Sequence, residues 1–127
     1  MPIQSTVEQA NKTIVSRATR HITLQDLTDY FASVWVGPQN AGFSEIFDWT
    51  DVDHIDVSEA ELRNFAGPAN AFYDDSSPSK LAIIALGRRG TRMAQLYRNF
   101  RELRGGKDPE IQVFSDIASA RVWLGIP

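Results

Sequence analysis

The chain has 127 residues, a formal net charge of −3, and hydrophobic and charged contents of 43% and 23%. These values fit one globular domain spanning residues 1–127 and argue against intrinsic disorder. Cysteine is absent, which excludes disulfides, thiolate nucleophiles and cysteine-based metal sites. The N-terminus lacks a basic segment followed by an apolar one, and no apolar run reaches membrane-spanning length, so we expect a soluble, cytoplasmic protein.

The first third of the sequence predicts an edge hairpin and then a helix. Residues 3–8 alternate apolar and polar side chains, and residues 13–18 are rich in Thr, Ile and Val, so two paired strands are expected. Thr23 is followed three positions later by Asp26, which is the pattern of a capped helix start. The Gly-Pro pair at residues 37–38 should end this helix.

The middle of the chain predicts a short strand and a second helix. Residues 44–49 (SEIFDW) have strand character, whereas the acidic stretch 48–56 is expected to form a solvated loop. Ser58 and Glu61 form an S-x-x-E capping box, in which each side chain satisfies a free backbone N–H at a helix start. The helix should therefore run over about residues 59–65.

An apolar run from Leu81 to Leu86 is the strongest strand signal. Six apolar residues without a charge are typical of a strand covered on both faces, so this is the predicted central strand. It continues through a glycine-bracketed turn at residues 87–90 into a helix whose outer face is predicted to carry Arg98 and Arg101. A last strand at 111–114 and a terminal helix complete the pattern, with Ser115 as its expected N-cap.

Strands alternating with helices at these spacings predict an α/β sandwich in a single domain. The expected sheet is mixed, mostly parallel and five-stranded, with about four helices. Basic charge is concentrated late in the chain, because residues 88–107 carry six Arg and one Lys against a single acid, Glu102. The whole chain is nevertheless acidic, with a pI of about 5.3, and it lacks nucleic-acid-binding motifs, so we expect no nucleic-acid partner.

The turn after the apolar strand is a candidate anion or ligand site. Free N–H groups at a helix start and forked guanidinium donors are how α/β proteins bind anions at the carboxyl end of a strand. The candidate residues are Gly87, Arg88, Arg89, Gly90, Thr91 and Arg92. The alternative is structural: the glycines make the turn, and the arginines are solvated or pair with the acidic stretch 48–56.

Three stretches carry a family resemblance: FDWTDVDHIDVSEAELRNF, the strand KLAIIALG with the helix TRMAQLYRNF, and the ending VFSDIASARVWL. Together they resemble the SpoIIAA-like family of STAS-related domains, which is also grouped with CRAL-TRIO lipid-transfer folds. The resemblance covers roughly Thr13 to Leu124. It implies an α/β sandwich with a mixed sheet, in a family whose members mostly lack an assigned activity.

The resemblance also implies one candidate for modification. Anti-sigma-factor antagonists present a phosphorylatable serine at a helix start, and the matching positions here are Asp56, Val57, Ser58 and Glu59. Ser58 would be the phosphoacceptor. Glu59 stands where the family has glycine, and its charge would repel an incoming phosphate group, so helix capping is the alternative role for Ser58.

The sequence assigns no catalytic residue, metal site or cofactor. His21 and His54 lack metal-binding spacing, and no G-x-S-x-G elbow marks a nucleophile. We therefore expect a non-enzymatic regulatory or binding domain for a partner protein or an amphipathic or anionic small ligand such as a lipid, with a homodimer as one expected assembly. The alternatives are a small enzyme acting on a phosphorylated or carboxylated metabolite at residues 87–92, and a regulator switched by phosphorylation of Ser58.

Overall fold

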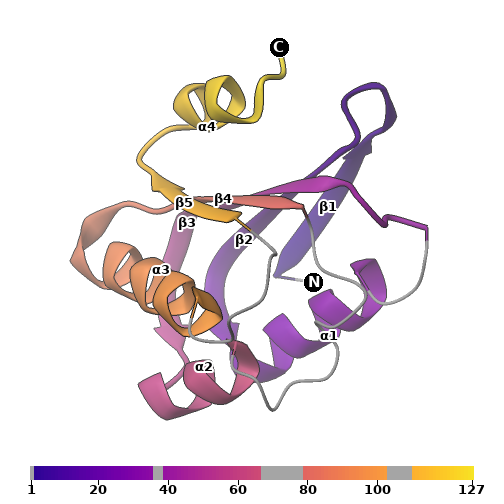
Figure 1. Cartoon of the computed structure of the whole chain (residues 1–127). Helices are drawn as coiled ribbons and strands as arrows, with labels where there is room; N and C mark the ends of the chain where they lie inside the picture. Colours follow the sequence, from indigo (N-terminus) through magenta and orange to yellow (C-terminus); the bar gives the residue numbers. More distant parts are fainter. Residues whose placement is uncertain (1, 36–38, 67–78, 103–109) are drawn as a thin grey trace.

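In the described part of the chain, a five-stranded mixed sheet and four α-helices form the fold (Figure 1). The computed structural model describes residues 2–35, 39–66, 79–102 and 110–127. The strands are β1 (Ile3–Glu8), β2 (Thr13–Thr23), β3 (Ser44–Asp56), β4 (Lys80–Ile84) and β5 (Glu110–Phe114). The helices are α1 (Leu24–Val34), α2 (Glu59–Ala66), α3 (Gly87–Glu102) and α4 (Ile117–Leu124). This order of elements confirms the predicted α/β sandwich.

The strands lie in the sheet in the same order as in the sequence, β1-β2-β3-β4-β5. β1 pairs antiparallel with β2, and this confirms the predicted edge hairpin. Its connection is a short 3-10 turn, Gln9–Asn11, followed by Lys12 in the left-handed region at φ 50°. The remaining pairs, β2 with β3, β3 with β4 and β4 with β5, are all parallel. β3, rather than β4 as predicted, is therefore the middle strand.

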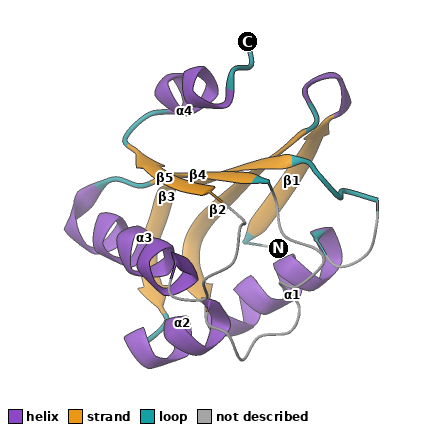
Figure 2. Ribbon diagram, viewed as in Figure 1, coloured by secondary structure: helices purple, strands orange, loops and turns teal. Residues whose placement is uncertain are grey.

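Helices cover both faces of the sheet, but unequally (Figure 2). α1, α2 and α3 lie on one face, and α4 lies alone on the other. The side chains of β4 alternate between two buried clusters accordingly: Leu81 and Ile83 pack toward the three helices, and Ala82 and Ile84 toward α4. The predicted burial of this strand on both faces is confirmed. The strand nevertheless ends at Ile84, and Leu86 is 52% exposed.

Helix capping follows the sequence signals for two helices and departs from them for a third. The Thr23 hydroxyl accepts from the Asp26 backbone N–H, while the Asp26 carboxylate accepts from the Thr23 backbone N–H, so the predicted box at α1 is confirmed. The equivalent box at α2 is described below with the site residues. At α4 the N-cap is Asp116, not Ser115, because the Asp116 carboxylate accepts from the backbone N–H of Ser119.

β3 is longer than its sequence pattern predicted. It spans 13 residues, so the acidic stretch 48–56 lies on a strand and not in a loop. β2 is also long, and its pairing with β3 continues to Thr23 opposite Asp56, which satisfies the backbone of both strands. Ile55 is buried on this extension, whereas its acids point outward, and Asp51 forms an ion pair with Arg17 across the strands.

The helix after β4 differs from its prediction at two points. α3 begins at Gly87, so residues 87–90 form its first turn and not a turn that precedes it. Arg101 is only 4% exposed, whereas the sequence placed it on the outer face. The physical reason is its spacing of seven residues from the fully buried Ala94, which brings both onto the same side of the helix. The expected helix end at residues 37–38 lies outside the described residues.

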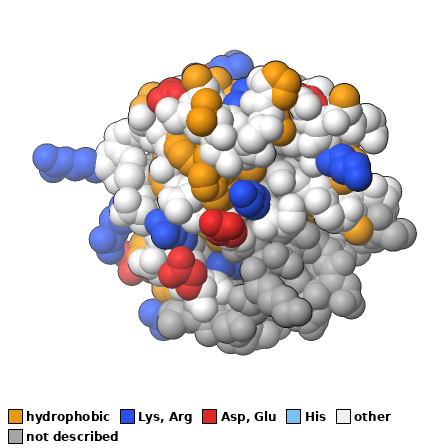
Figure 3. Space-filling model, turned by 45° about the horizontal axis from the view of Figure 1, so that its top comes forward, with side chains coloured by type: hydrophobic (Ala, Val, Ile, Leu, Met, Phe, Trp, Pro, Cys, Tyr) orange, Lys and Arg blue, Asp and Glu red, His pale blue; other side chains and the backbone are white. Residues whose placement is uncertain are grey.

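The α4 face of the sheet is only partly covered. Figure 3 shows this side of the molecule, where hydrophobic side chains reach the surface between charged ones. Val122 on α4 is 79% exposed and Ile117 is 42% exposed. Arg121 ties the helix to the opposite end of the chain, because its guanidinium donates to the Glu8 carboxylate at 2.9 and 3.2 Å.

Candidate functional site

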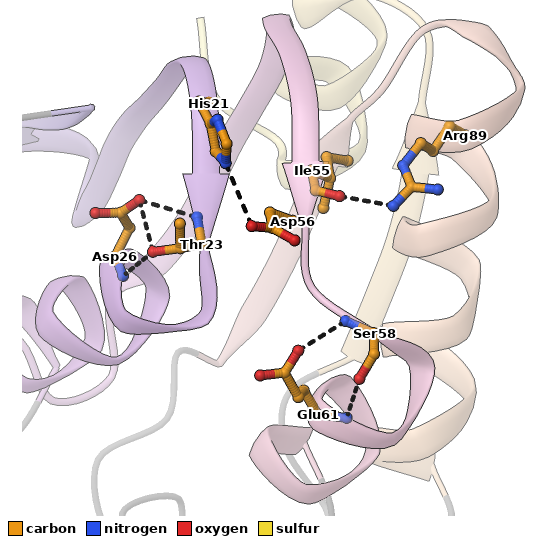
Figure 4. Close-up of polar contacts among 8 residues, drawn as sticks. All are labelled: His21, Thr23, Asp26, Ile55, Asp56, Ser58, Glu61 and Arg89. Atoms are coloured by element: carbon orange, nitrogen blue, oxygen red, sulfur yellow. Dashed lines mark hydrogen bonds and ion pairs between the residues drawn. The ribbon is translucent and has the colours of Figure 1, made fainter.

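The predicted anion segment, residues 87–92, is occupied largely by structural contacts. Arg89 donates to the backbone carbonyl of Ile55 at 2.7 Å (Figure 4). Arg92 forms an ion pair with Glu59 at 2.5 Å and so connects α3 to α2. Arg88 is exposed. Two of the three arginines therefore hold the fold together, and binding of an anion at this helix start stays a prediction.

Ser58 has the structural role that its sequence context predicts. Its hydroxyl accepts from the Glu61 backbone N–H at 3.1 Å, and its own backbone N–H donates to the Glu61 carboxylate at 3.0 Å (Figure 4). The capping box is thus confirmed. Ser58 is exposed, and its phosphorylation stays a prediction.

The two histidines meet across the sheet, although nothing in their spacing indicated a contact. The rings of His21 and His54 lie edge to face with centroids 4.8 Å apart, and His21 Nε2 is 3.6 Å from a carboxylate oxygen of Asp56. All three side chains are exposed. Across the described ranges, no group of three or more His, Asp or Glu residues is arranged to hold a metal ion.

The carboxyl of Glu45 is the most unusual group in the structure, and it is not among the site residues predicted from the sequence. Among the described residues it is the only buried acidic side chain, at 4% exposure. Glu45 is the second residue of β3, and its side chain lies on the face covered by α1, α2 and α3. A buried carboxylate loses its hydration and must be compensated by partners, so its neighbours decide its state.

A chain of hydroxyl groups connects Glu45 to the sheet edge. The Tyr30 hydroxyl on α1 donates to Glu45 Oε2. The same hydroxyl lies 2.5 Å from Ser16 Oγ on β2, and Ser16 Oγ lies 2.9 Å from Ser5 Oγ on β1. Since Tyr30 uses its proton on Glu45, Ser16 donates to Tyr30. Ser5 is exposed, so the chain runs from the surface to the buried acid.

Burial has the largest effect on the pKa values of Glu45 and Tyr30. Loss of hydration raises the pKa of Glu45 to about 7, even though the Tyr30 hydrogen bond, the Trp35 indole and the Arg101 charge act to lower it. The buried Trp35 Nε1 makes no hydrogen bond of normal geometry with the described residues. Burial and the negative charge of Glu45 raise the pKa of Tyr30 well above its usual value. Glu45 is therefore the proton-exchanging member near neutral pH.

Glu45 faces a cavity of about 40 Å³ between the sheet and the three helices. This volume admits about three water molecules. The other described lining residues are aliphatic or aromatic, and the aromatic members of the lining are Tyr30, Phe31, Phe47, Trp49, Phe65 and Tyr97. Trp49, Phe65 and Tyr97 are partly exposed, whereas the other three are buried. The cavity thus has a polar floor, aromatic walls and a more exposed side.

Neighbouring rings in this lining brace one another. Tyr30 and Phe47 have centroids 5.0 Å apart, and Phe47 meets Trp49 edge to face at 5.7 Å. Phe65 contacts Phe31 at 6.3 Å and Tyr97 at 6.2 Å. These separations lie in the favourable range for aromatic pairs. An aromatic lining with one buried acid is typical of a small-molecule pocket, in which apolar side chains form the walls and a few polar groups orient the ligand.

One signal in the sequence pointed to Glu45. In the strand SEIFDW, side chains alternate between faces, so Glu45 must lie on the same face as Phe47 and Trp49. An acid flanked on its own face by two aromatic residues is a candidate buried group. The burial of Arg101 had a similar signal in its spacing from Ala94, as described above.

Comparison with known proteins identifies the class of fold. No family model matches the chain, and no curated protein matches it. A solved structure does match: an uncharacterised protein of the DUF3478 family with a SpoIIAA-like fold, from Shewanella loihica PV-4. The two share 18% sequence identity with a TM-score of 0.59, and the match covers 96% of this chain and 93% of that one.

The chain therefore has a SpoIIAA-like fold, as its sequence indicated. At this level of identity the match establishes the fold and leaves the activity to be argued from the site. Within the described part of the chain, no helix has both the length and the apolar character needed to cross a membrane.

Proposed function

We propose that this protein is a non-enzymatic binding domain that holds a small amphipathic ligand in the cavity over β3 and β4. The ligand's apolar part would lie against the aromatic lining, and its polar end would contact Glu45. The observation that supports this most is the position of Glu45 itself, a buried acid facing a mostly apolar cavity. Burying such a group is costly, and binding sites are where proteins accept that cost.

The hydrogen bonds of Glu45 support a role in orienting a ligand. Oε2 accepts from Tyr30, the Trp35 indole also acts on the carboxyl, and no other hydrogen bond of normal geometry to Glu45 occurs within the described ranges. A carboxylate has about four acceptor positions, so Glu45 can accept further bonds from a ligand. Tyr30 is itself buried and anchored by Ser16. The polar end of the pocket is thus fixed in place before a ligand arrives, which lowers the entropic cost of binding.

Titration with N-phenyl-1-naphthylamine, an aromatic dye whose fluorescence rises in apolar surroundings, tests the proposal. The dye is larger than the cavity of about 40 Å³, so its rings would extend along the partly exposed Trp49, Phe65 and Tyr97. We expect a saturable increase in fluorescence with wild-type protein. Tyr97→Ala removes part of the lining and should weaken dye binding several-fold. Phe114→Ala is the matched control, because Phe114 is a partly buried aromatic residue on the α4 side of the sheet. No saturable signal, or equal loss in both variants, would refute the assignment.

The sequence also predicted a partner protein or a second copy of the chain, and this stays a prediction. The exposed Val122 and Ile117 on α4 are the apolar groups that such a contact would cover. Native mass spectrometry of untreated protein separates the two readings: excess mass lost on denaturation indicates a ligand, and a bare oligomer indicates association.

A further inference from the structure

We infer that the ligand of this pocket carries a protonated amine, so that an alkylammonium group binds to Glu45 with its apolar part against the aromatic lining. This inference rests on the proposed function and names the chemical class of the ligand. It also departs from the anionic ligand expected from the sequence, because the charged group at the floor of the cavity is an acid. The charge, the lining and the size of the cavity each favour such a ligand.

The charge of the pocket favours a cation. Of the described residues that line the cavity, Glu45 is the only charged one. Within the described part of the chain, the titratable or charged groups that act on it are Tyr30 from α1 and Arg101 from α3. Their effect does not offset the loss of hydration, because burial still raises the pKa of Glu45 to about 7. Among the described residues the buried carboxylate accepts one hydrogen bond of normal geometry, from Tyr30, so an ammonium group in the cavity would supply a further hydrogen bond and an opposite charge.

The aromatic lining also favours a ligand that carries a cationic group. Six aromatic side chains surround the cavity, and ring faces attract a nearby cation through their quadrupole, most strongly for Trp. Combined with a carboxylate, such rings form a site that recognises an organic cation. An anionic group would instead be repelled by the carboxylate.

The size of the cavity favours a small head group. About 40 Å³ is room for an ammonium and an adjacent methylene or two, with the rest of the ligand extending along the partly exposed Trp49, Phe65 and Tyr97. The ammonium can donate to the carboxylate positions that Tyr30 leaves open, in a charge-assisted hydrogen bond.

Three compounds with the same phenyl body and a different polar end test the inference: 2-phenylethylamine, 2-phenylethanol and phenylacetate. Each competes with N-phenyl-1-naphthylamine at about pH 8, where Glu45 with a pKa of about 7 is mostly ionised. We expect the amine to bind about tenfold more tightly than the alcohol, and phenylacetate to bind most weakly. Glu45→Gln should bring the amine and the alcohol to similar affinities. Asp53→Asn, which removes an exposed acid from the same strand, should preserve the difference.

The outcomes distinguish this inference from the proposed function. Binding of the alcohol or phenylacetate as tightly as the amine would overturn the inference and leave the pocket in place. Failure of all three compounds and of the dye would overturn both. A preference for the amine that survives in Glu45→Gln would also overturn the inference, because the cation would then be bound elsewhere.

Discussion

Replacing Glu45 by Gln should change how the stability of this protein depends on pH. Gln has nearly the same shape and can still accept the Tyr30 hydrogen bond, but it does not ionise. In the native state, burial raises the pKa of Glu45 from 4.5 to about 7. The unfolded chain has the ordinary value, so the shift is linked to stability. It corresponds to about 3 kcal/mol of unfolding free energy.

The direction of the effect follows from where the proton is held. Below pH 4.5 the Glu45 carboxyl is protonated in both the native and the unfolded state, so it does not lower the free energy of unfolding. Between 4.5 and about 7 the unfolded state loses this proton while the native state keeps it, so the free energy of unfolding falls as pH rises. Wild type should lose about 3 kcal/mol relative to Glu45→Gln across this window.

Urea unfolding followed by tryptophan fluorescence at pH values from about 4.5 to 8.5 measures this difference. The contributions of other titrating groups cancel when the two proteins are compared at each pH. In Glu45→Gln, Arg101 loses the negative charge beside it, and the resulting change in the free energy of unfolding does not vary with pH once Glu45 of the wild type is ionised. Asp53→Asn, an exposed acid on the same strand, controls for the loss of one acid and should follow wild type. Parallel curves for wild type and Glu45→Gln would refute the reasoning, because they would mean that Glu45 is hydrated in the folded protein.

Three further predictions concern single contacts. Tyr30→Phe removes a hydrogen bond that lowers the pKa of Glu45, so the step in stability should move to higher pH in the same urea experiment. Gly87→Ala should lower the free energy of unfolding by about 1 kcal/mol, because φ is +77° at this position. Gly90→Ala should raise it by about 0.5–1 kcal/mol in urea unfolding, because alanine favours the helix and the added Cβ would meet only Ala85 Cβ, at 3.8 Å. Ser58→Ala should cost about 1 kcal/mol through the lost cap. Intact-mass analysis of protein from its native cell tests phosphorylation, and an unmodified mass would contradict the switch.

Patterns local in sequence predicted most of the fold. The alternation in residues 3–8, the two capping boxes and the apolar run before α3 each depend on neighbours within a few positions, and each appears in the structure. The length of β3 was predicted wrongly because pairing with another strand determines it. β3 continues through its acidic stretch because β2 supplies backbone partners along its whole length, and no local pattern in β3 encodes that length.

The candidate site was less predictable than the fold. Arginines beside glycines at a helix start predicted an anion site. In the structure, Arg89 and Arg92 instead contact residues 34 and 33 positions earlier in the sequence, Ile55 and Glu59. Glu45 was overlooked because a single acid in a strand is normally exposed. The alternation with Phe47 and Trp49 shows which face Glu45 shares, but not that α1 and α3 cover this face and bury the carboxyl.

The sequential strand order has a consequence for where a ligand can bind. In doubly wound sheets a binding crevice opens beyond the carboxyl ends of the strands, at the point where the strand order reverses direction. Here β2 to β5 follow one another without a reversal, and right-handed crossovers place α1, α2 and α3 on the same face. Glu45 accordingly lies near the amino end of β3, opposite Leu81 near the start of β4. Side chains on three successive crossover helices therefore shape the cavity, so substitutions there can alter ligand preference while the sheet keeps its register.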